Sequence, residues 1–185
     1  AENSKLDGAV VDIAYTIDDS DMSVVEKIHV LRKLHEGNKS ALERAIDLKQ
    51  NILDSIAMGA SRIGHGIMTK NLSEAEQKMM IEKQIVLEMA PTSNFQTKAV
   101  TELAQYPFKE LYDKGIHVTL NTDNRMVSAT NLSKEYEKIS AWYPDFSLSD
   151  FEKINHYAID GAFIGQEEKE ELHQRFTKEY KKISE

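Results

Sequence analysis

The chain has 185 residues, of which 41% are hydrophobic and 8% aromatic, a balance typical of globular domains. The net charge of −8 argues against nucleic-acid binding, which needs a cationic surface, and no basic amphipathic stretch favours a membrane surface. The chain has no cysteine, and none of its apolar runs approaches the roughly 18 residues that span a bilayer. Residues 1–5 also lack the apolar core of a secretory signal. For these three reasons we expect a cytoplasmic protein.

Short apolar runs alternate with amphipathic stretches along the chain. The runs that predict buried strands are residues 8–13, 61–67, 84–89 and 116–120. Helices are predicted from residue 23 to a stop at 35–38, and over 40–58, 73–82, 131–141, 149–159 and 167–183, with an interrupted helical stretch near residue 107. Residues 91–94 are expected to form a loop. Capping boxes are predicted at Ser73 with Glu76 and at Ser149 with Glu152.

The alternation of strands with helices predicts a parallel sheet covered by helices. In such folds, ligands bind at the carboxyl ends of the strands. Each of the three clearest strands is followed directly by a polar cluster. The clusters are His65 between two glycines, Thr92-Ser93-Asn94 behind a proline, and Thr122-Asp123-Asn124.

Each cluster also has an ordinary structural explanation. A histidine between glycines is commonly a turn residue or a satisfied core residue, and Asn and Asp after a strand are common in turns and helix caps. Their shared position at strand ends favours a functional role, because a histidine and a carboxylate on one rim suit divalent-metal binding or acid–base chemistry. The residues alone therefore favour an α/β enzyme of hydrolase type.

Three segments resemble successive motifs of the adenosine deaminase family, in the family's order. They are Arg62-Ile-Gly-His-Gly-Ile67, Leu87-Glu-Met-Ala-Pro-Thr-Ser-Asn94 and Val118-Thr-Leu-Asn-Thr-Asp-Asn-Arg125. Residues 51–60 and 128–136 also resemble the family, so the likeness runs from about Asn51 to the C-terminus. It implies a fold of the (β/α)8 TIM-barrel type, of which this chain supplies the C-terminal strands and helices. We expect a single domain over residues 1–185, incomplete relative to the family and poorly matched over residues 1–50.

The resemblance also implies zinc-dependent hydrolytic deamination of adenosine or 2′-deoxyadenosine to the corresponding inosine. His65 would orient and polarise the attacking hydroxide. Asp123 would ligate the zinc ion and accept a proton from the attacking water. Asn124 stands where many relatives carry a second aspartate, and its NH2 group can still donate to a ring nitrogen of the purine. Ser93 would support the metal-site side chains from behind.

Two family motifs are missing. The chain has no His-x-His pair, and residues 40–50, where a His-Ala-Gly-Glu motif is expected, form a plain amphipathic helix pattern. His35, followed by Glu36, is the nearest alternative metal ligand, although helix termination explains it equally well. The incomplete ligand set leaves two alternatives to an adenosine deaminase: a non-catalytic binding module of the same fold, and a deaminase of another purine such as adenine. An open half-barrel would also expose edge strands and apolar surface, so we expect it to form a homo-oligomer, to bind a missing half or to close in an unfamiliar way.

Overall fold

The structure, a computed structural model, describes residues 41–184. The chain divides into two compact units, residues 1–48 and 49–185, and the second unit holds the sheet. The predicted strand at 8–13, the helix predicted from residue 23 and the candidate ligand His35 lie outside the described residues.

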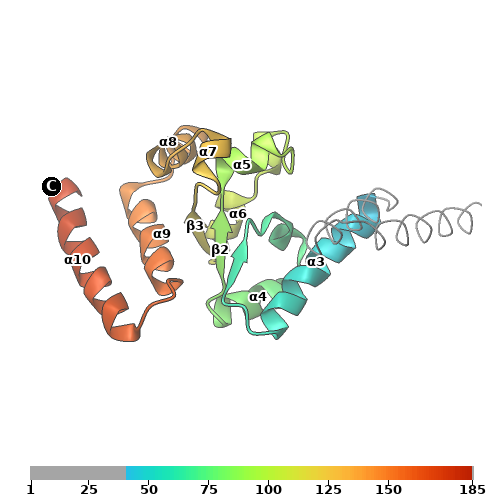
Figure 1. Cartoon of the computed structure of the whole chain (residues 1–185), viewed down its shortest axis with the longest axis horizontal. Helices are drawn as coiled ribbons and strands as arrows, with labels where there is room; N and C mark the ends of the chain where they lie inside the picture. Colours follow the sequence, from blue (N-terminus) through green and yellow to red (C-terminus); the bar gives the residue numbers. More distant parts are fainter. Residues whose placement is uncertain (1–40, 185) are drawn as a thin grey trace, which may run out of the picture. The chain divides into compact units, whose positions relative to one another are not determined.

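The centre of the second unit is a parallel sheet of three strands, β1 (Arg62–Gly64), β2 (Val86–Met89) and β3 (His117–Leu120), in the order β1-β2-β3 (Figure 1). Ile63 pairs with Leu87 and Leu87 with Val118, so the strands run in register. Because the strands are parallel, their carboxyl ends meet at one edge of the sheet. The predicted strands within 61–67, 84–89 and 116–120 are thereby confirmed.

Helices follow each strand and cover the sheet (Figure 1). Their bounds are α3 (Ala41–Ala57), the 3₁₀ helix η1 (Ile67–Asn71), α4 (Glu74–Glu82), α5 (Pro91–Gln96), the 3₁₀ helix η2 (Leu103–Gln105), α6 (Phe108–Asp113), α7 (Arg125–Ser128), α8 (Leu132–Trp142), α9 (Leu148–Asp160) and α10 (Gln166–Ser184). This strand–helix alternation is the architecture of part of a (β/α)8 barrel, as the sequence predicted.

The hydrophobic core lies around β2 and β3. Leu87 and Val118 are completely buried in the sheet, and Phe108 of α6 and Ile139 of α8 are completely buried against it. Strands that are covered by helices read as nearly continuous apolar runs, which explains why 84–89 and 116–120 were recognisable in the sequence. Each such side chain contributes roughly 1.5–3 kcal/mol when it leaves water.

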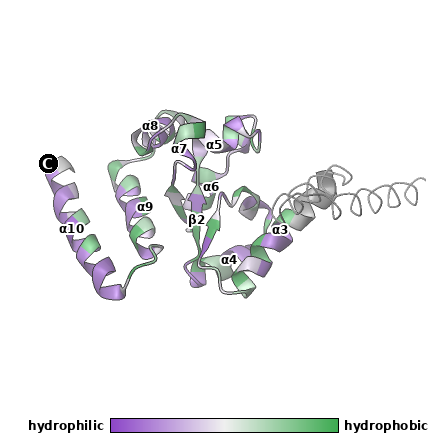
Figure 2. Cartoon of the chain, viewed as in Figure 1, coloured by the Kyte–Doolittle hydropathy of each residue, from purple (hydrophilic) through white to green (hydrophobic). Residues whose placement is uncertain are grey.

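The C-terminal helices form successive layers on one side of the sheet. α9 packs against β3, where the His117 and Tyr157 rings stack with centroids 3.9 Å apart, and α10 packs against α9. Figure 2 shows mostly hydrophilic colouring along α10, interrupted by hydrophobic bands, as an outer amphipathic helix requires. In the described part of the chain, no helix combines the length and the apolar character needed to cross a membrane. The cytoplasmic location stays a prediction.

Two local predictions were wrong. Residues 91–94 do not form a loop but begin the short helix α5, in which Pro91 occupies the first turn, where its missing N–H costs nothing. The capping box of α9 is formed by Ser147 and Asp150 rather than by the predicted Ser149 pair. The capping box at Ser73 is confirmed.

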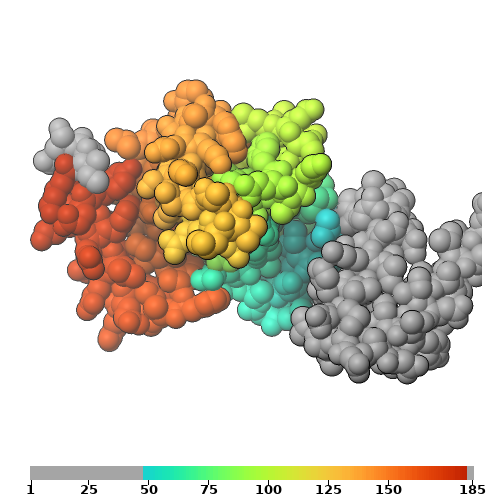
Figure 3. Space-filling model, turned by 45° about the horizontal axis from the view of Figure 1, so that its top comes forward, coloured from blue at the N-terminus to red at the C-terminus, as the bar shows by residue number. Residues whose placement is uncertain are grey.

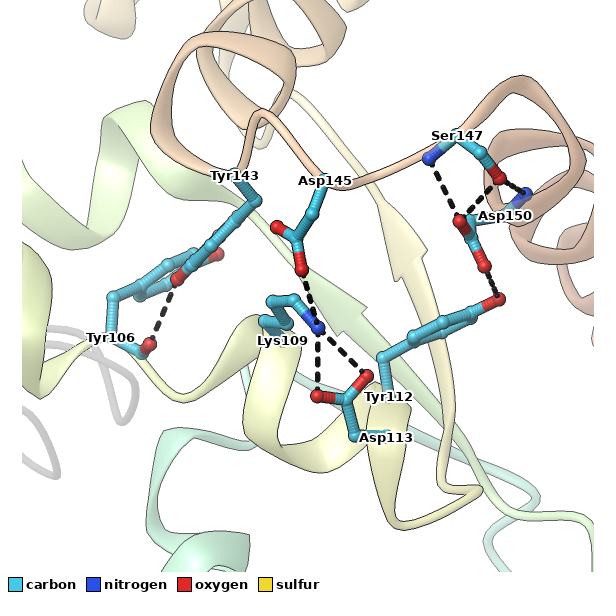
Figure 4. Close-up of polar contacts among 8 residues, drawn as sticks. All are labelled: Tyr106, Lys109, Tyr112, Asp113, Tyr143, Asp145, Ser147 and Asp150. Carbon is cyan, nitrogen blue, oxygen red and sulfur yellow. Dashed lines mark hydrogen bonds and ion pairs between the residues drawn. The ribbon is translucent and has the colours of Figure 1, made fainter.

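A group of polar contacts joins α6 to the segment between α8 and α9 and to the first turn of α9 (Figure 4). The Lys109 ammonium contacts the carboxylates of Asp113 and Asp145 at 2.9 and 3.3 Å. The Tyr112 hydroxyl donates to Asp150 Oδ1 at 2.7 Å. Together with the Ser147 hydroxyl, which has the larger effect, this bond holds the pKa of the Asp150 carboxyl below its usual value.

Replacing Tyr112 with phenylalanine is expected to lower the free energy of unfolding near neutral pH by about 1.5–3 kcal/mol, the usual range for a hydrogen bond to a charged group. Since the pKa of Asp150 is depressed in the folded state, its stabilising effect is present above the unfolded pKa of about 3.9 and is lost as the pH falls through the lower folded value. Urea titrations at neutral and acidic pH should therefore show a smaller difference between the two proteins in acid. A difference that grows in acid would contradict this assignment.

Candidate active site

An open cavity of about 330 Å³ lies at the carboxyl ends of the three strands. This edge carries the active site in (β/α)8 enzymes. A larger hollow of about 450 Å³ is lined by α9, α10 and the turn between them, away from the strand ends. The strand-end cavity is the better candidate because two of the polar clusters line it and the third, Thr92-Ser93-Asn94, bonds to side chains of the other two. Its lining residues are Gly64, His65, Glu88, Ala90, Asn121, Thr122 and Asp123.

His65 directly follows β1, and its backbone N–H donates to the Glu88 carbonyl of β2 at 3.0 Å. The backbone φ is 59° at His65 and 61° at Gly66, so the chain leaves the strand through two left-handed residues. Non-glycine residues rarely adopt this conformation, and those that do are concentrated at functional sites. The turn places the imidazole on the wall of the cavity.

Alanine at Gly66 is expected to lower the free energy of unfolding by at least about 1–2 kcal/mol, the cost of a left-handed conformation for a residue with a side chain. Its Cβ would also lie 2.7 Å from Leu87 Cδ2, so the turn or the core leucine would have to move. Urea denaturation measures the loss. Gly64→Ala is the matched control, since a Cβ there meets no atom within 4 Å. Equal losses in the two variants would refute the role given to the turn.

Asp123 follows β3 on the opposite side of the cavity and also has a left-handed backbone, with φ of 53°. The Ser93 hydroxyl donates to Asp123 Oδ2 at 2.7 Å. This bond, assisted by the backbone N–H of Asn124, holds the pKa of the Asp123 carboxyl below its usual value. The carboxyl is therefore ionised at neutral pH and can accept a proton or bind a cation.

The structure brings His65 and Asp123 together. His65 Nε2 lies 3.9 Å from Asp123 Oδ2, and each side chain is 46% exposed. This separation is too long for a direct hydrogen bond. An oxygen atom about 2.8 Å from both atoms would complete a triangle on the 3.9 Å base. The pair is thus arranged to hold one water-sized group at the mouth of the cavity.

The short helix α5 supports both side chains. Ser93 bonds to Asp123, and Asn94 Nδ2 lies 2.9 Å from His65 Nδ1. Asn94 is only 2% exposed. Its contact with His65 was not predicted from the sequence, because the two residues lie far apart along the chain. The motif Thr92-Ser93-Asn94 was the available signal, since its polar side chains follow a buried strand.

A buried glutamate of α8 holds α5 in place through hydrogen bonds. The carboxylate of Glu135 is completely buried and accepts hydrogen bonds from the backbone N–H of Thr92, at 2.9 Å, and from the hydroxyls of Thr92 and Thr130. Lys138 donates to the Thr92 hydroxyl in turn. In the space-filling view, the yellow to orange segment of α7 and α8 lies against the green segment of α5 (Figure 3). This network fixes the helix that carries Ser93 and Asn94.

Asn124 serves as the N-cap of α7. Its Oδ1 accepts from the backbone N–H groups of Met126 and Val127, each at 3.1 Å. This is the structural role that Asn commonly has at such a position. Since Oδ1 is engaged, the part of the side chain that remains for a ligand is the Nδ2 amide, a donor, so the predicted contact with a purine nitrogen stays a prediction.

The described residues do not complete a zinc site. Within residues 41–184, no cluster of three or more His, Cys, Asp or Glu side chains is placed to hold a metal ion. A catalytic zinc normally has three protein ligands. Asp123 offers a suitable carboxylate, and His65 Nε2 lies 3.9 Å from it, but these two side chains do not make a set of three ligands. Zinc binding and the ligand role of Asp123 therefore stay predictions.

The fold and the strand-end residues define part of a (β/α)8 barrel with a His–Asp pair at the carboxyl ends of its strands. The adenosine deaminase family model matches residues 31–179, so the match begins upstream of Asn51. The adenosine deaminase of Lactococcus lactis is 92% identical over 152 residues, covering 82% of this chain and 42% of that protein. That of Enterococcus faecalis is 38% identical over 166 residues, covering 90% and 46%. The chain belongs to the adenosine deaminase family.

Solved structures agree with the family assignment. The apo N6-methyl-AMP deaminase of Arabidopsis thaliana superposes with a TM-score of 0.60 at 26% identity, covering 70% of this chain and 37% of that one. An adenine deaminase from Arthrobacter aurescens gives a TM-score of 0.59 at 24% identity, over 65% and 36%, which shows a shared fold. The chain spans less than half the length of these curated relatives and structures.

Proposed function

We propose that the chain contributes the carboxyl-terminal part of a purine deaminase site whose substrates are adenosine and 2′-deoxyadenosine. The observation that carries this proposal is the His65–Asp123 pair, 3.9 Å apart across the rim cavity of a chain that belongs to the adenosine deaminase family. Water adds to the purine carbon that bears the amine, and ammonia leaves. The products are inosine or 2′-deoxyinosine and ammonia.

Each side chain has a distinct part in this reaction. Asp123, whose pKa the Ser93 hydrogen bond holds below its usual value, accepts a proton from the attacking water. His65 orients the water, and the amide of Asn124 donates to a ring nitrogen of the purine. The zinc ion that the family resemblance implies belongs to this proposal, with Asp123 as one ligand. Because the described residues do not complete its ligand set, these steps are assigned to the side chains alone.

The test combines a turnover assay with metal analysis of the purified full chain. The absorbance change from adenosine to inosine, with near-stoichiometric zinc, is the expected result. If the protein shows no turnover and holds no zinc even at high protein concentration, the proposal is wrong. Adenine and N6-methyl-AMP should be compared with adenosine, since proteins with those activities share the fold. If free adenine is turned over faster than adenosine, the substrate assignment changes from the nucleoside to the free base.

A second candidate function has one observation in its favour. The absence of a three-ligand cluster from residues 41–184 suits a non-catalytic module that keeps the purine-binding rim. In that case adenosine should bind to the zinc-free chain without being converted. Calorimetric titration with adenosine, followed by product analysis of the same sample, separates the two functions. Binding without inosine formation would favour the module.

A further inference from the structure

Two consecutive residues of α5 reach the two side chains of the candidate site. Ser93 donates to Asp123, and the neighbouring Asn94 contacts His65 through its Nδ2 atom, 2.9 Å from His65 Nδ1. Asn94 has 2% of its surface exposed, so water does not compete for this contact. Such a buried amide determines which imidazole nitrogen carries the proton, since an NH2 group can only donate.

The orientation of the Asn94 amide decides the direction of this hydrogen bond. Its Oδ1 is buried and has no hydrogen-bond partner. If the amide were turned around, the NH2 group would occupy that position and its two N–H donors would lie where the oxygen now has no partner. A buried carbonyl oxygen tolerates the lack of a partner better than N–H donors do. The orientation with Nδ2 donating to the imidazole is therefore favoured.

We infer that Asn94 is a positioning residue whose hydrogen bond to Nδ1 holds the His65 ring in the tautomer that has its proton on Nε2. Nδ1 accepts the Asn94 hydrogen bond, so the ring proton resides on the nitrogen that faces Asp123. This assignment of the proton stands on geometry alone, whereas its catalytic consequence rests on the proposed function.

The consequence is a division of labour between the two side chains. With Nε2 protonated, His65 offers one donor, while the Asp123 carboxylate, 3.9 Å away, offers one acceptor. A water held between them would accept from His65 and donate to Asp123. His65 therefore cannot remove a proton from that water through Nε2, and the proton moves to Asp123. Asn94 selects this outcome without touching the substrate.

Nitrogen-15 NMR of the uniformly labelled full chain tests the assignment without any need for turnover. For the neutral ring of His65, identified by its loss in His65→Gln, the Nδ1 signal should be pyridine-like and the Nε2 signal pyrrole-like. A scalar coupling across the hydrogen bond should connect Asn94 Nδ2 with His65 Nδ1. A pyrrole-like, protonated Nδ1 would overturn the inference even if no variant folds.

Asn94→Asp is the decisive variant because it nearly preserves shape but replaces the donor with an acceptor. The proton should then move to Nδ1, with the Nε2 signal becoming pyridine-like or the ring doubly protonated. Gln96→Ala is the matched control, since this exposed residue of the same helix donates to the Ser128 carbonyl instead. It should leave the His65 spectrum unchanged. An unchanged spectrum in Asn94→Asp would refute the role of Asn94.

The proposed function supplies a separate readout. In a turnover-competent protein, Asn94→Asp should lower kcat by about 10–100-fold, the usual effect of altering a residue that orients a site group. KM should change little, because Asn94 does not contact the substrate. If the NMR results agree but no protein turns over adenosine, the proposed function fails while the inference about Asn94 stands. A raised KM with unchanged kcat would contradict the positioning role.

Discussion

Replacing Glu135 with alanine is expected to lower the free energy of unfolding by at least about 3 kcal/mol. The change removes the acceptor of three buried hydrogen bonds, from the Thr92 N–H and from the hydroxyls of Thr92 and Thr130. A buried donor left without a partner costs about 1–3 kcal/mol. Lys138 donates to the Thr92 hydroxyl, which would no longer have the Glu135 carboxylate as its acceptor. Urea denaturation followed by circular dichroism measures the loss.

Glu137→Ala is the matched control, because Glu137 lies on the same helix α8 but is exposed. Its effect should be within about 0.5 kcal/mol, as for most surface substitutions. Glu135→Gln keeps the shape of the side chain but replaces one acceptor oxygen with a donor group, so an intermediate loss is expected. If Glu135→Ala and Glu137→Ala unfold at the same urea concentration, the anchoring role assigned to Glu135 is wrong.

Alanine at Asp123 is expected to lower kcat/KM for adenosine by about 10²–10⁴-fold, the usual contribution of a positioned proton acceptor. The side chain is exposed at the rim and outside the hydrophobic core, so the loss of stability should not exceed about 1.5–3 kcal/mol, the range for its hydrogen bond with Ser93. If zinc is bound, this variant should lose it as well. Turnover, zinc content and the urea midpoint, measured on the same preparation, separate loss of chemistry from loss of folding.

Asn124→Ala provides the comparison on the neighbouring residue. It should mainly raise KM, because the proposed role of the amide is to bind the purine ring. It should also cost about 1 kcal/mol of stability, since Asn124 caps α7. Zinc content equal to that of the parent in Asp123→Ala would refute the ligand role of Asp123. Equal activity would refute its role as proton acceptor.

The parts of the fold that could be predicted from the sequence depend on neighbours along the chain. The apolar runs within 84–89 and 116–120 are buried on both faces, and the capping box at Ser73 forms within four residues. The short helix α5 was missed because six residues are too few to show a helical period. For α9, both Ser147 and Ser149 precede an acid at the correct spacing, and the Tyr112–Asp150 bond favours the first pair.

The candidate site shows the same limit. His65, Ser93 and Asp123 were selected because each follows a strand, and parallel strands bring their carboxyl ends to one edge. The contacts of Asn94 with His65 and of Thr92 with Glu135 join residues 29 and 43 positions apart, so they depend on how helices pack after the sheet has formed. No local pattern in the sequence specifies such pairs.

The single helical turn that carries Ser93 and Asn94 couples the two halves of the rim mechanically. Ser93 and Asn94 are adjacent in α5 and bond to Asp123 and His65, respectively. A tilt of α5 would therefore move both side chains at once. The side chains of His65 and Asp123 should therefore be aligned together or misaligned together. A ligand or mutation that displaces α5 would therefore change the positions of both side chains without contacting the cavity itself.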